Sequence, residues 1–377
     1  MRLLFVSGTS VGGAARSTYE LAEIMRQRGH TVATLMTDDA ATAVIERHKR
    51  WLNSCVKLDR HPLTRPFATV VNSLRRTIGC ARSHAAGHAH PAWTCPLPEN
   101  AFEATFRECT PDVVIVNSVE RPAWRYIRQF CADLGIPTVL YVREASGVRH
   151  LVDPPAAASI IMANAEAHAV EVRALGFDCA VVPSVVETEK CITATDRTEI
   201  VMVNPVTMYG IDLALDIAQR LHHLPFTFVE SWPLTEHERD ALTKKCRTLG
   251  NARLLPYQDD PRQVYAHAKV LLMLCTVASR PRVVLEAQAN GIPVLAVDRP
   301  GHGEVVGPGG ILVAPDALLD EWVETLSNLW NDADLYEQLR LAALDHARRH
   351  DATPTAVAER FESLLATHVG TEASHVA

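Results

Sequence analysis

Short apolar runs alternate with helical segments along most of this 377-residue chain. The first 40 residues contain the apolar run "RLLFVSG", a glycine-rich turn, the amphipathic segment "AARSTYELAEIMRQRG" and the apolar run "TVATLMTDD". This order is typical of a strand, helix, strand unit, with Gly29 where a glycine commonly ends a helix. Strands joined by helices run parallel in one sheet, so the sequence predicts an α/β fold.

The alternation falls into two halves. In the first, "PDVVIVNS" and "PTVLYVREASG" flank a helical segment, and "ASIIMANAEAHAVEVRALGFDCAVVPSVVE" adds a strand, helix and strand. The polar segment "TEKCITATDRTE" is the best linker candidate, and six apolar runs follow it: "IVMVNPV", "FTFVES", "ARLLPYQ", "KVLLMLC", "PVLAVD" and "GILVAP". We therefore expect two doubly wound, Rossmann-like domains, residues 1–188 and 189–354. Residues 355–377 would form an amphipathic helix and a mobile tail, "GTEASHVA".

Composition excludes several classes of protein. With 47% hydrophobic and 21% charged residues the chain is typical of a folded globular protein, and a net charge of -7 gives no reason to expect nucleic acid as a partner. No apolar stretch reaches the roughly 20 residues that span a bilayer, and "MRLLFVSG" is unlike a cleaved signal peptide. The nine scattered cysteines form no CxxC pair, which is typical of reduced thiols in the cytoplasm.

Two segments, one rich in histidine and one rich in glycine, are candidate sites. Residues 60–105 read as loops around a helix, and His84, His88 and His90 within them are expected to be solvated rather than to bind metal. In "GTSVGGAARST" the glycines lie between a strand and a helix, where N–H groups can hold an anion. A plain tight turn is the alternative. Asp38 and Asp39 end the next strand, but the spacing is not the G-x-G-x-x-G of a nicotinamide-dependent oxidoreductase.

The stretch "CTVASRPRVVLEAQANGIPVLAVD" holds a single acid, Glu286. We expect Ser279 to cap a helix that begins near Arg280 and ends at the "NG" of residues 290 and 291. Glu286 would then lie about one turn from the helix N-terminus and could accept hydroxyl groups of a ribose. Glutamate is common in the first or second turn of a helix, which is the competing interpretation, but Arg280 and Arg282 would add positive charge for a diphosphate.

Arg143 and Glu144 directly follow the buried run "PTVLYV". They are expected either to face a ligand site or to form an ion pair at the edge of the sheet.

Several segments together resemble the retaining GT-B glycosyltransferases of family four: "GGAARSTYELAEIMRQRGHTV", "VPSVVE", "NARLLPYQDDPRQVYAHAKVLLML", "RVVLEAQANGIPVLAVD" and "GEVVGPGGILV". The resemblance implies two Rossmann-like domains facing a cleft, with the acceptor bound mainly by the first and a nucleotide-sugar donor mainly by the second. It implies sugar transfer with retention, without a metal or other cofactor. It also implies a final helix that crosses back to the first domain. Gly12 and Gly13 match the glycine loop that faces the donor phosphates and the acceptor.

The resemblance assigns roles in the second half. Glu286 matches the second acid of the E-x7-E motif, which holds the ribose hydroxyls. The N–H groups of Arg282 and Val283 match those that hold the diphosphate, and Pro256 and Tyr257 match the loop beside the base.

The chain also departs from the family pattern. Ala278 stands where the motif has its first acid, and Pro281 where it has a glycine. Asn204 and Tyr209 stand in place of the arginine and lysine that clamp the diphosphate, and Asn117 in place of a histidine. The arginines that could replace the clamp are Arg280, Arg282, Arg16 and Arg143.

These assignments give two sets of candidate residues. The candidate catalytic residues are Arg143, Glu144, Asn117 and Arg16. The candidate donor-binding residues are Glu286, Arg282, Val283, Arg280, Ser279, Tyr257, Pro256, Asn204, Tyr209, Gly12 and Gly13.

We therefore expect a cytoplasmic glycosyltransferase that acts on a small-molecule or glycan acceptor in specialised-metabolite or surface-glycan biosynthesis. The alternative is a GT-B-fold protein that does not transfer sugars, either as a partner of an active enzyme or through an atypical coupling on a nucleotide-linked substrate.

Overall fold

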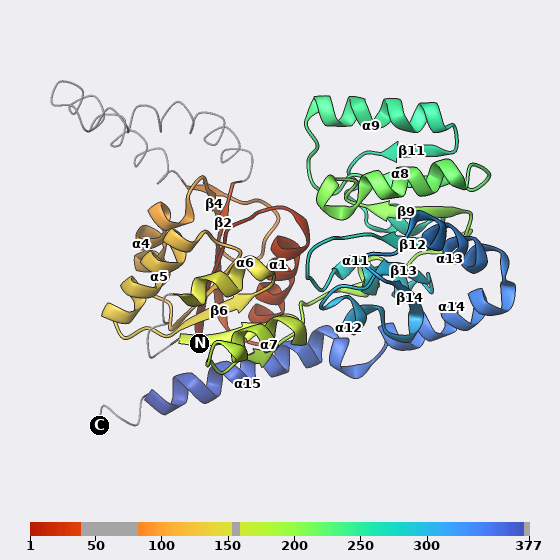
Figure 1. Cartoon of the computed structure of the whole chain (residues 1–377). Helices are drawn as coiled ribbons and strands as arrows, with labels where there is room; N and C mark the ends of the chain where they lie inside the picture. The colour runs from red at the N-terminus through yellow and green to blue at the C-terminus, as the bar shows by residue number, and fades with distance from the viewer. Residues whose placement is uncertain (39–81, 153–158, 373–377) are drawn as a thin grey trace, which may run out of the picture. The chain divides into compact units, whose positions relative to one another are not determined.

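The computed structural model describes residues 1–38, 82–152 and 159–372. The chain forms two compact units (Figure 1). Unit 1 comprises Met1–Ala163, Glu171–Val182 and Ala358–Ala377, and unit 2 comprises Asn164–Val170 and Pro183–Val357. The division expected from the sequence differs from this grouping at residues 164–170, 183–188 and 355–357, all of which group with the second unit.

Unit 1 is built on an eight-stranded sheet in the order β3-β4-β2-β1-β5-β6-β7-β8. All pairs of neighbouring strands are parallel except β3 with β4. The strands are β1 (Arg2–Ser7), β2 (Thr31–Thr37), β3 (Ser83–His84), β4 (Ala92–Cys95), β5 (Val113–Asn117), β6 (Thr138–Val142), β7 (Ser159–Ala163) and β8 (Ala180–Val181). The apolar runs of the first half thus form strands, as predicted.

The helices of this half follow the predicted alternation. They are α1 (Gly12–Gln27), α4 (Pro98–Cys109), α5 (Arg121–Asp133), the short α6 (Ala145–Val148) and α7 (Glu166–Ala174). Gly29 has a φ of 91° and follows α1, which confirms the glycine that ends this helix.

The expectation of loops around a helix over residues 60–105 is wrong at β3 and β4 but agrees with α4, which begins at Pro98. β4 extends the sheet beside β2, and Trp93 within it is 4% exposed, because apolar side chains of this segment pack in the core. Of the three histidines expected to be solvated, His84 is exposed. His90 is only 7% exposed, and the half-buried ring of His88 stacks on Tyr19 at 4.0 Å. Residues 60–81 and Asp39 lie outside the described residues.

The last helix, α15 (Pro354–Glu372), packs on unit 1 through the residues after position 357. Phe361 stacks on Phe5 of β1 with ring centroids 6.1 Å apart. Glu362 accepts hydrogen bonds from the Arg28 guanidinium at 2.6 and 2.9 Å, and its other oxygen lies 2.8 Å from His30 Nε2. The helix reaches Glu372, so the first residues of the predicted mobile tail are helical.

We expect Glu362→Ala to destabilise unit 1 by about 1 kcal/mol in urea denaturation at pH 7, because the carboxylate is only 30% exposed and bonds two partners. Arg28, followed by His30, lowers the pKa of Glu362 below its ordinary 4.5. The stabilisation is therefore present above pH 4.5 and is lost as the pH falls through the lower pKa of the folded state. The matched control is Glu359→Ala, since Glu359 lies 3.8 Å from the same arginine and is 55% exposed. Equal effects of the two variants would contradict this role.

Unit 2 has a six-stranded, fully parallel sheet in the order β11-β10-β9-β12-β13-β14. The strands are β9 (Glu199–Val203), β10 (Phe226–Val229), β11 (Ala252–Leu255), β12 (Ala268–Met273), β13 (Val294–Val297) and β14 (Gly310–Val313). Each of the six apolar runs predicted for this half forms one strand. The polar segment taken as a linker packs against unit 2, where the Asn290 side chain bonds Cys191 and Thr193.

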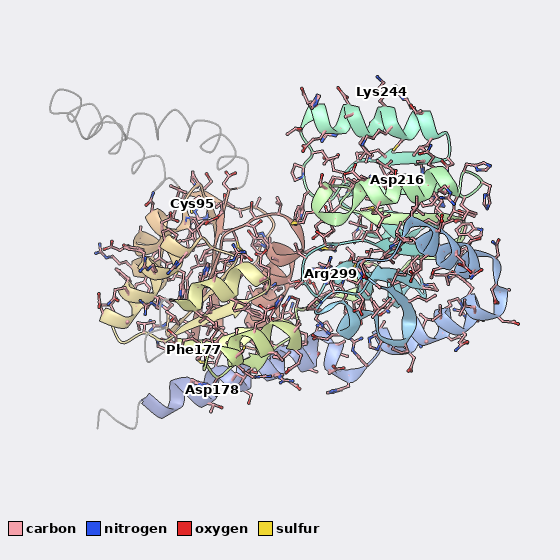
Figure 2. The ribbon with its side chains drawn as sticks, in the orientation of Figure 1. Cys95, Phe177, Asp178, Asp216, Lys244 and Arg299 are labelled. Carbon is pink, nitrogen blue, oxygen red and sulfur yellow. The ribbon has the colours of Figure 1, made fainter. Side chains whose placement is uncertain are left out.

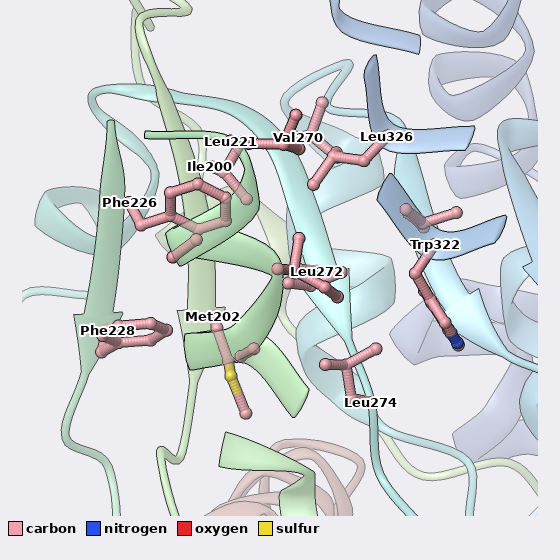
Figure 3. Packing of buried hydrophobic residues seen from close by; sticks show 14 of the residues in the cluster. Ile200, Met202, Leu221, Phe226, Phe228, Val270, Leu272, Leu274, Trp322 and Leu326 are labelled. Carbon is pink, nitrogen blue, oxygen red and sulfur yellow. The ribbon is translucent and has the colours of Figure 1, made fainter. Parts of the chain in front are cut away.

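Successive residues of these strands point to opposite faces, and both faces are covered. One face carries Ile200, Phe226 and Leu272, which pack with Trp322 and Leu326 of α13 (Figure 3). The opposite face packs against α10, α11 and α12. The helices of this unit are α8 (Ile211–Arg220), α9 (Glu236–Leu249), α10 (Arg262–Tyr265), α11 (Arg282–Ala289), α12 (His302–Val306), α13 (Leu319–Asn331) and α14 (Ala333–Ala347).

The outer surfaces of α8 and α9 carry charged side chains. Asp216 of α8 and Lys244 of α9 are exposed, and Lys244 points away from the sheet (Figure 2). None of the helices in the described ranges is long and apolar enough to cross a membrane.

Candidate functional site

Each sheet has one point where the order of its strands reverses, and α/β proteins bind ligands beside such points, at the carboxyl ends of strands. The reversal lies between β1 and β5 in unit 1 and between β9 and β12 in unit 2. Every residue predicted for the site lies at the carboxyl end of a strand, in the loop after it or in the following helix.

In unit 2, the loops after β9 (residues 204–210) and β12 (residues 274–281) are bonded to each other. The Met208 carbonyl accepts hydrogen bonds from the N–H and the hydroxyl of Thr276, each at 3.0 Å. Gly210 has a φ of 81°, and a Cβ there would lie 2.6 Å from Cβ of Leu274. The two loops therefore have a fixed relative position.

The loop after β12 is also bonded, through Ser279, to the loop after β13. The N–H of Ser279 donates to the Pro300 carbonyl at 3.1 Å, and its Oγ lies 3.3 Å from Nε2 of His302. His302 is fully buried, and its Nδ1 lies 2.8 Å from the Val297 carbonyl. Burial lowers the pKa of His302, so the ring is neutral near pH 7.

The predicted cap by Ser279 is wrong, because its side chain bonds His302 and Val277 instead. The helix α11 begins at Arg282, later than predicted, and Pro281 before it is extended, with φ −67° and ψ 125°. A residue that precedes proline is disfavoured in the helical region, so Arg280 cannot start the helix. The predicted end is confirmed, since Gly291 after α11 has a φ of 62°.

Glu286 lies in α11 and is 3% exposed. Its Oε1 accepts from Nε of Arg282 at 2.7 Å, and its Oε2 accepts from the Tyr265 hydroxyl at 2.7 Å. Arg282 is itself 8% exposed. Burial, followed by the Glu286 carboxylate, raises the pKa of Tyr265 well above its ordinary value, so the hydroxyl remains a donor. The lone acid of the sequence is therefore the centre of a buried group of three side chains.

The two residues in the clamp positions both contact Trp232. Asn204 has a φ of 62°, and its Oδ1 accepts a hydrogen bond from the backbone N–H of Trp232 at 2.8 Å. The rings of Tyr209 and Trp232 meet edge to face with centroids 5.3 Å apart. An aromatic pair thus stands beside the positions at which the family pattern predicts two cations.

The remaining donor-binding candidates lie around this edge of the sheet. Pro256 and Tyr257 follow β11, and Tyr257 is 61% exposed, so its ring is accessible. Val283 is half-buried in the first turn of α11. Arg280 is near enough to His346 to contribute, after burial and Arg349, to lowering the pKa of that ring.

In unit 1, Arg143 lies beside the glycine turn. Its side chain is 6% exposed, donates to the Ala14 carbonyl at 3.1 Å and stacks over the ring of Tyr141 at 4.4 Å. Gly12 and Gly13 begin α1, directly before Ala14. The structure therefore brings Arg143 and the predicted glycine loop together.

The other catalytic candidates have different surroundings. Asn117 is 1% exposed and bonds Ser7 at 3.1 Å and Thr18 at 3.3 Å, contacts that hold β1, β5 and α1 together. Arg16 lies 3.5 Å from Glu20, one turn further along α1. Glu144 is exposed. The side chain of Arg143 instead donates to the Ala14 carbonyl and stacks over the ring of Tyr141.

Three residues of the site were missed in the sequence: Tyr265, Trp232 and His302. Each is a single aromatic or histidine in an ordinary helical or loop segment, 21 to 28 residues from its partner. No group of three or more His, Cys, Asp or Glu side chains in the described part of the chain is arranged to hold a metal.

Gly301 is the most constrained backbone position in unit 2's site. It has a φ of 89°, and a Cβ there would lie 2.4 Å from the Ser279 carbonyl oxygen. We expect Gly301→Ala to lower the free energy of unfolding by roughly 1–3 kcal/mol, since overpacking and a left-handed alanine both cost stability. Gly303→Ala is the control, because the nearest contact of its Cβ is a flexible Leu312 methyl at 3.6 Å. Equal thermal denaturation midpoints for the two variants would contradict the close approach.

Comparisons with known proteins agree with this architecture. A 115-residue part of the chain is 36% identical to D-inositol 3-phosphate glycosyltransferase of Nocardia farcinica, a match that covers 29% of this chain and 25% of that protein. The Anabaena protein Alr3699/HepE, solved with UDP and glucose, has a TM-score of 0.71 at 14% identity and covers 97% of this chain and 99% of its own. Sucrose-phosphate synthase of Thermosynechococcus elongatus has a TM-score of 0.73 at 12% identity over 98% and 100%. The chain thus has the two-domain α/β fold of GT-B glycosyltransferase structures, and its residues 192–346 match the family of glycosyl transferases group 1.

Proposed function

We propose that this protein transfers a sugar from a nucleotide-sugar donor to a small-molecule or glycan acceptor, with retention at the anomeric carbon and without a metal or other cofactor. One observation carries the proposal. The segment that matches the glycosyltransferase family, residues 192–346, contains the loops on both sides of the strand reversal in unit 2 and the Arg282–Glu286 pair beside them. The fold alone does not require a buried charge pair at this position, so the pair points to a function of the site.

The first requirement of such a reaction is stabilisation of the leaving diphosphate. The early N–H groups of a helix have no partner within the helix and attract anions, and α11 begins at the reversal point. In the proposal, Arg282 contributes its positive charge there while Glu286 holds its side chain in place. One electrostatic contact of this kind is typically worth about 3 to 4 kcal/mol of activation free energy.

The buried group of Arg282, Glu286 and Tyr265 would also recognise the nucleoside. Each oxygen of an ionised carboxylate can accept more than one hydrogen bond, so Glu286 can bond a ribose hydroxyl while it keeps Tyr265 and Arg282. Tyr257, exposed after β11, would pack against the base. The complexes of the similar Anabaena protein with UDP and with UDP-glucose support a nucleotide-sugar donor.

In unit 1, we assign acceptor binding to the glycine turn and Arg143. Tyr141 and the Ala14 carbonyl fix the guanidinium of Arg143 next to the first turn of α1. Asn117 would act as a positioning residue through Ser7 and Thr18, since both of its amide atoms are bonded to them. A cytoplasmic biosynthetic role in specialised-metabolite or surface-glycan assembly remains part of the proposal.

The test is calorimetric titration of the protein with UDP, ADP, GDP and their glucose or mannose derivatives. We expect Glu286→Gln to weaken binding of the preferred nucleotide roughly 10-fold, because a charge-assisted hydrogen bond to ribose becomes a neutral one. The control is Glu199→Gln, which neutralises a carboxylate paired with Arg253 at the opposite end of β9. No binding of any of these nucleotides, or equal effects of the two variants, would contradict the proposal.

A second candidate function rests on the clamp positions. Asn204 and Tyr209 are neutral and are engaged with Trp232, and Ala278 carries no acid. These observations favour a protein that binds a nucleotide but does not transfer a sugar, either as a partner of an active enzyme or in an atypical coupling. Product formation by the purified chain with a nucleotide sugar and a panel of acceptors, in the presence of EDTA, would exclude the partner role and support metal-independent transfer.

A further inference from the structure

We propose that His302 is a positioning residue that fixes the Ser279 hydroxyl as a hydrogen-bond acceptor for a hydroxyl group of the donor sugar. This inference rests on the proposed function and extends it to side chains that the family pattern does not assign. Ser279 is half-buried in the loop after β12, next to the strand reversal of unit 2. Its hydroxyl is therefore within reach of a ligand bound at the start of α11.

The protonation of His302 follows from its two partners. The Val297 carbonyl, 2.8 Å from Nδ1, can only accept a hydrogen bond, so Nδ1 carries the ring proton. The ring is buried and neutral, which leaves Nε2 as an acceptor. Nε2 lies 3.3 Å from Ser279 Oγ, so the serine hydroxyl is the donor in this bond.

Two further groups lie near the hydroxyl. The Val277 carbonyl lies 3.4 Å from Ser279 Oγ and can only accept. Cys275 Sγ lies 3.7 Å from the same carbonyl, to which its thiol donates, and 3.9 Å from Ser279 Oγ. Because Ser279 gives its single proton to Nε2 of His302, Oγ keeps its lone pairs, and a sugar hydroxyl bonds it by donating.

The backbone keeps this side chain in place. The bond from the Ser279 N–H to Pro300 and the close approach of Gly301 to its carbonyl hold the loop after β12 against the loop after β13. Ala278, the neighbouring position, has no polar side chain, while an acid at that position would be an obligate acceptor when ionised. Ser279, held by His302, would accept a hydrogen bond as that acid would, but without its negative charge.

The pairing can be measured on the ligand-free protein. The ¹⁵N resonances of the His302 ring at pH 7 should show a protonated Nδ1 and an unprotonated Nε2, and Ser279→Ala should shift the Nε2 signal and leave Nδ1 unchanged. A ring protonated at Nε2, or a Nε2 signal that does not respond to Ser279→Ala, would overturn the assignment of His302.

The functional step is tested by comparing the affinities for a nucleoside diphosphate and its sugar derivative, with UDP and UDP-glucose, ADP and ADP-glucose, and GDP and GDP-mannose as the probes. Ser279→Ala and His302→Phe should weaken binding of the nucleotide sugar roughly 3- to 10-fold, the value of one hydrogen bond, and leave the diphosphate affinity unchanged. Thr248→Ala, which removes a hydroxyl of α9 that already donates to the Lys244 carbonyl, should change neither affinity. Thermal denaturation establishes that each variant is folded.

The outcomes separate this inference from the proposed function. Equal weakening of both ligands, or no weakening of the nucleotide sugar, overturns the role of Ser279 and His302 while nucleotide binding stands. No binding of any probe by the unaltered protein overturns the proposed function together with this inference.

Discussion

The reversal of strand order between β9 and β12 is the constraint on which the site of unit 2 depends. Helices cover both faces of a parallel sheet, so the carboxyl ends of its strands are where polar groups can gather. At the reversal the loops after two adjacent strands leave in opposite directions, and here they are joined through Met208 and Thr276. The start of α11 follows one of them, so its N–H groups lie where this topology leaves room for an anion.

The group of Arg282, Glu286 and Tyr265 connects stability with function. Buried charges are tolerated only when they are paired, and removal of one partner typically costs about 3–5 kcal/mol. Here both oxygens of the carboxylate are bonded within the protein, which fixes its orientation before any ligand binds. A glutamate-to-glutamine change is therefore more informative than truncation, because it keeps the shape of the group.

Periodicity was enough to predict the strands of both sheets and the end of α11 at Gly291, because these features depend on residues close in the sequence. The contacts of Glu286 with Tyr265, of Asn204 with Trp232 and of Ser279 with His302 could not be predicted, since each spans more than 20 residues. Arg282 is only four residues from Glu286, which is the spacing of neighbours on one face of a helix. The wrong cap has a local cause in Pro281 and a long-range cause in His302. The strand at residues 92–95 was missed because it is short and lies in a segment rich in proline and histidine.

The contact of Gly301 with the Ser279 carbonyl also bears on how such a protein can evolve. Two loops from neighbouring strands touch through their backbones, so an insertion or deletion in either would force the other to move. New donor preferences would therefore arise through side-chain replacement at fixed loop length.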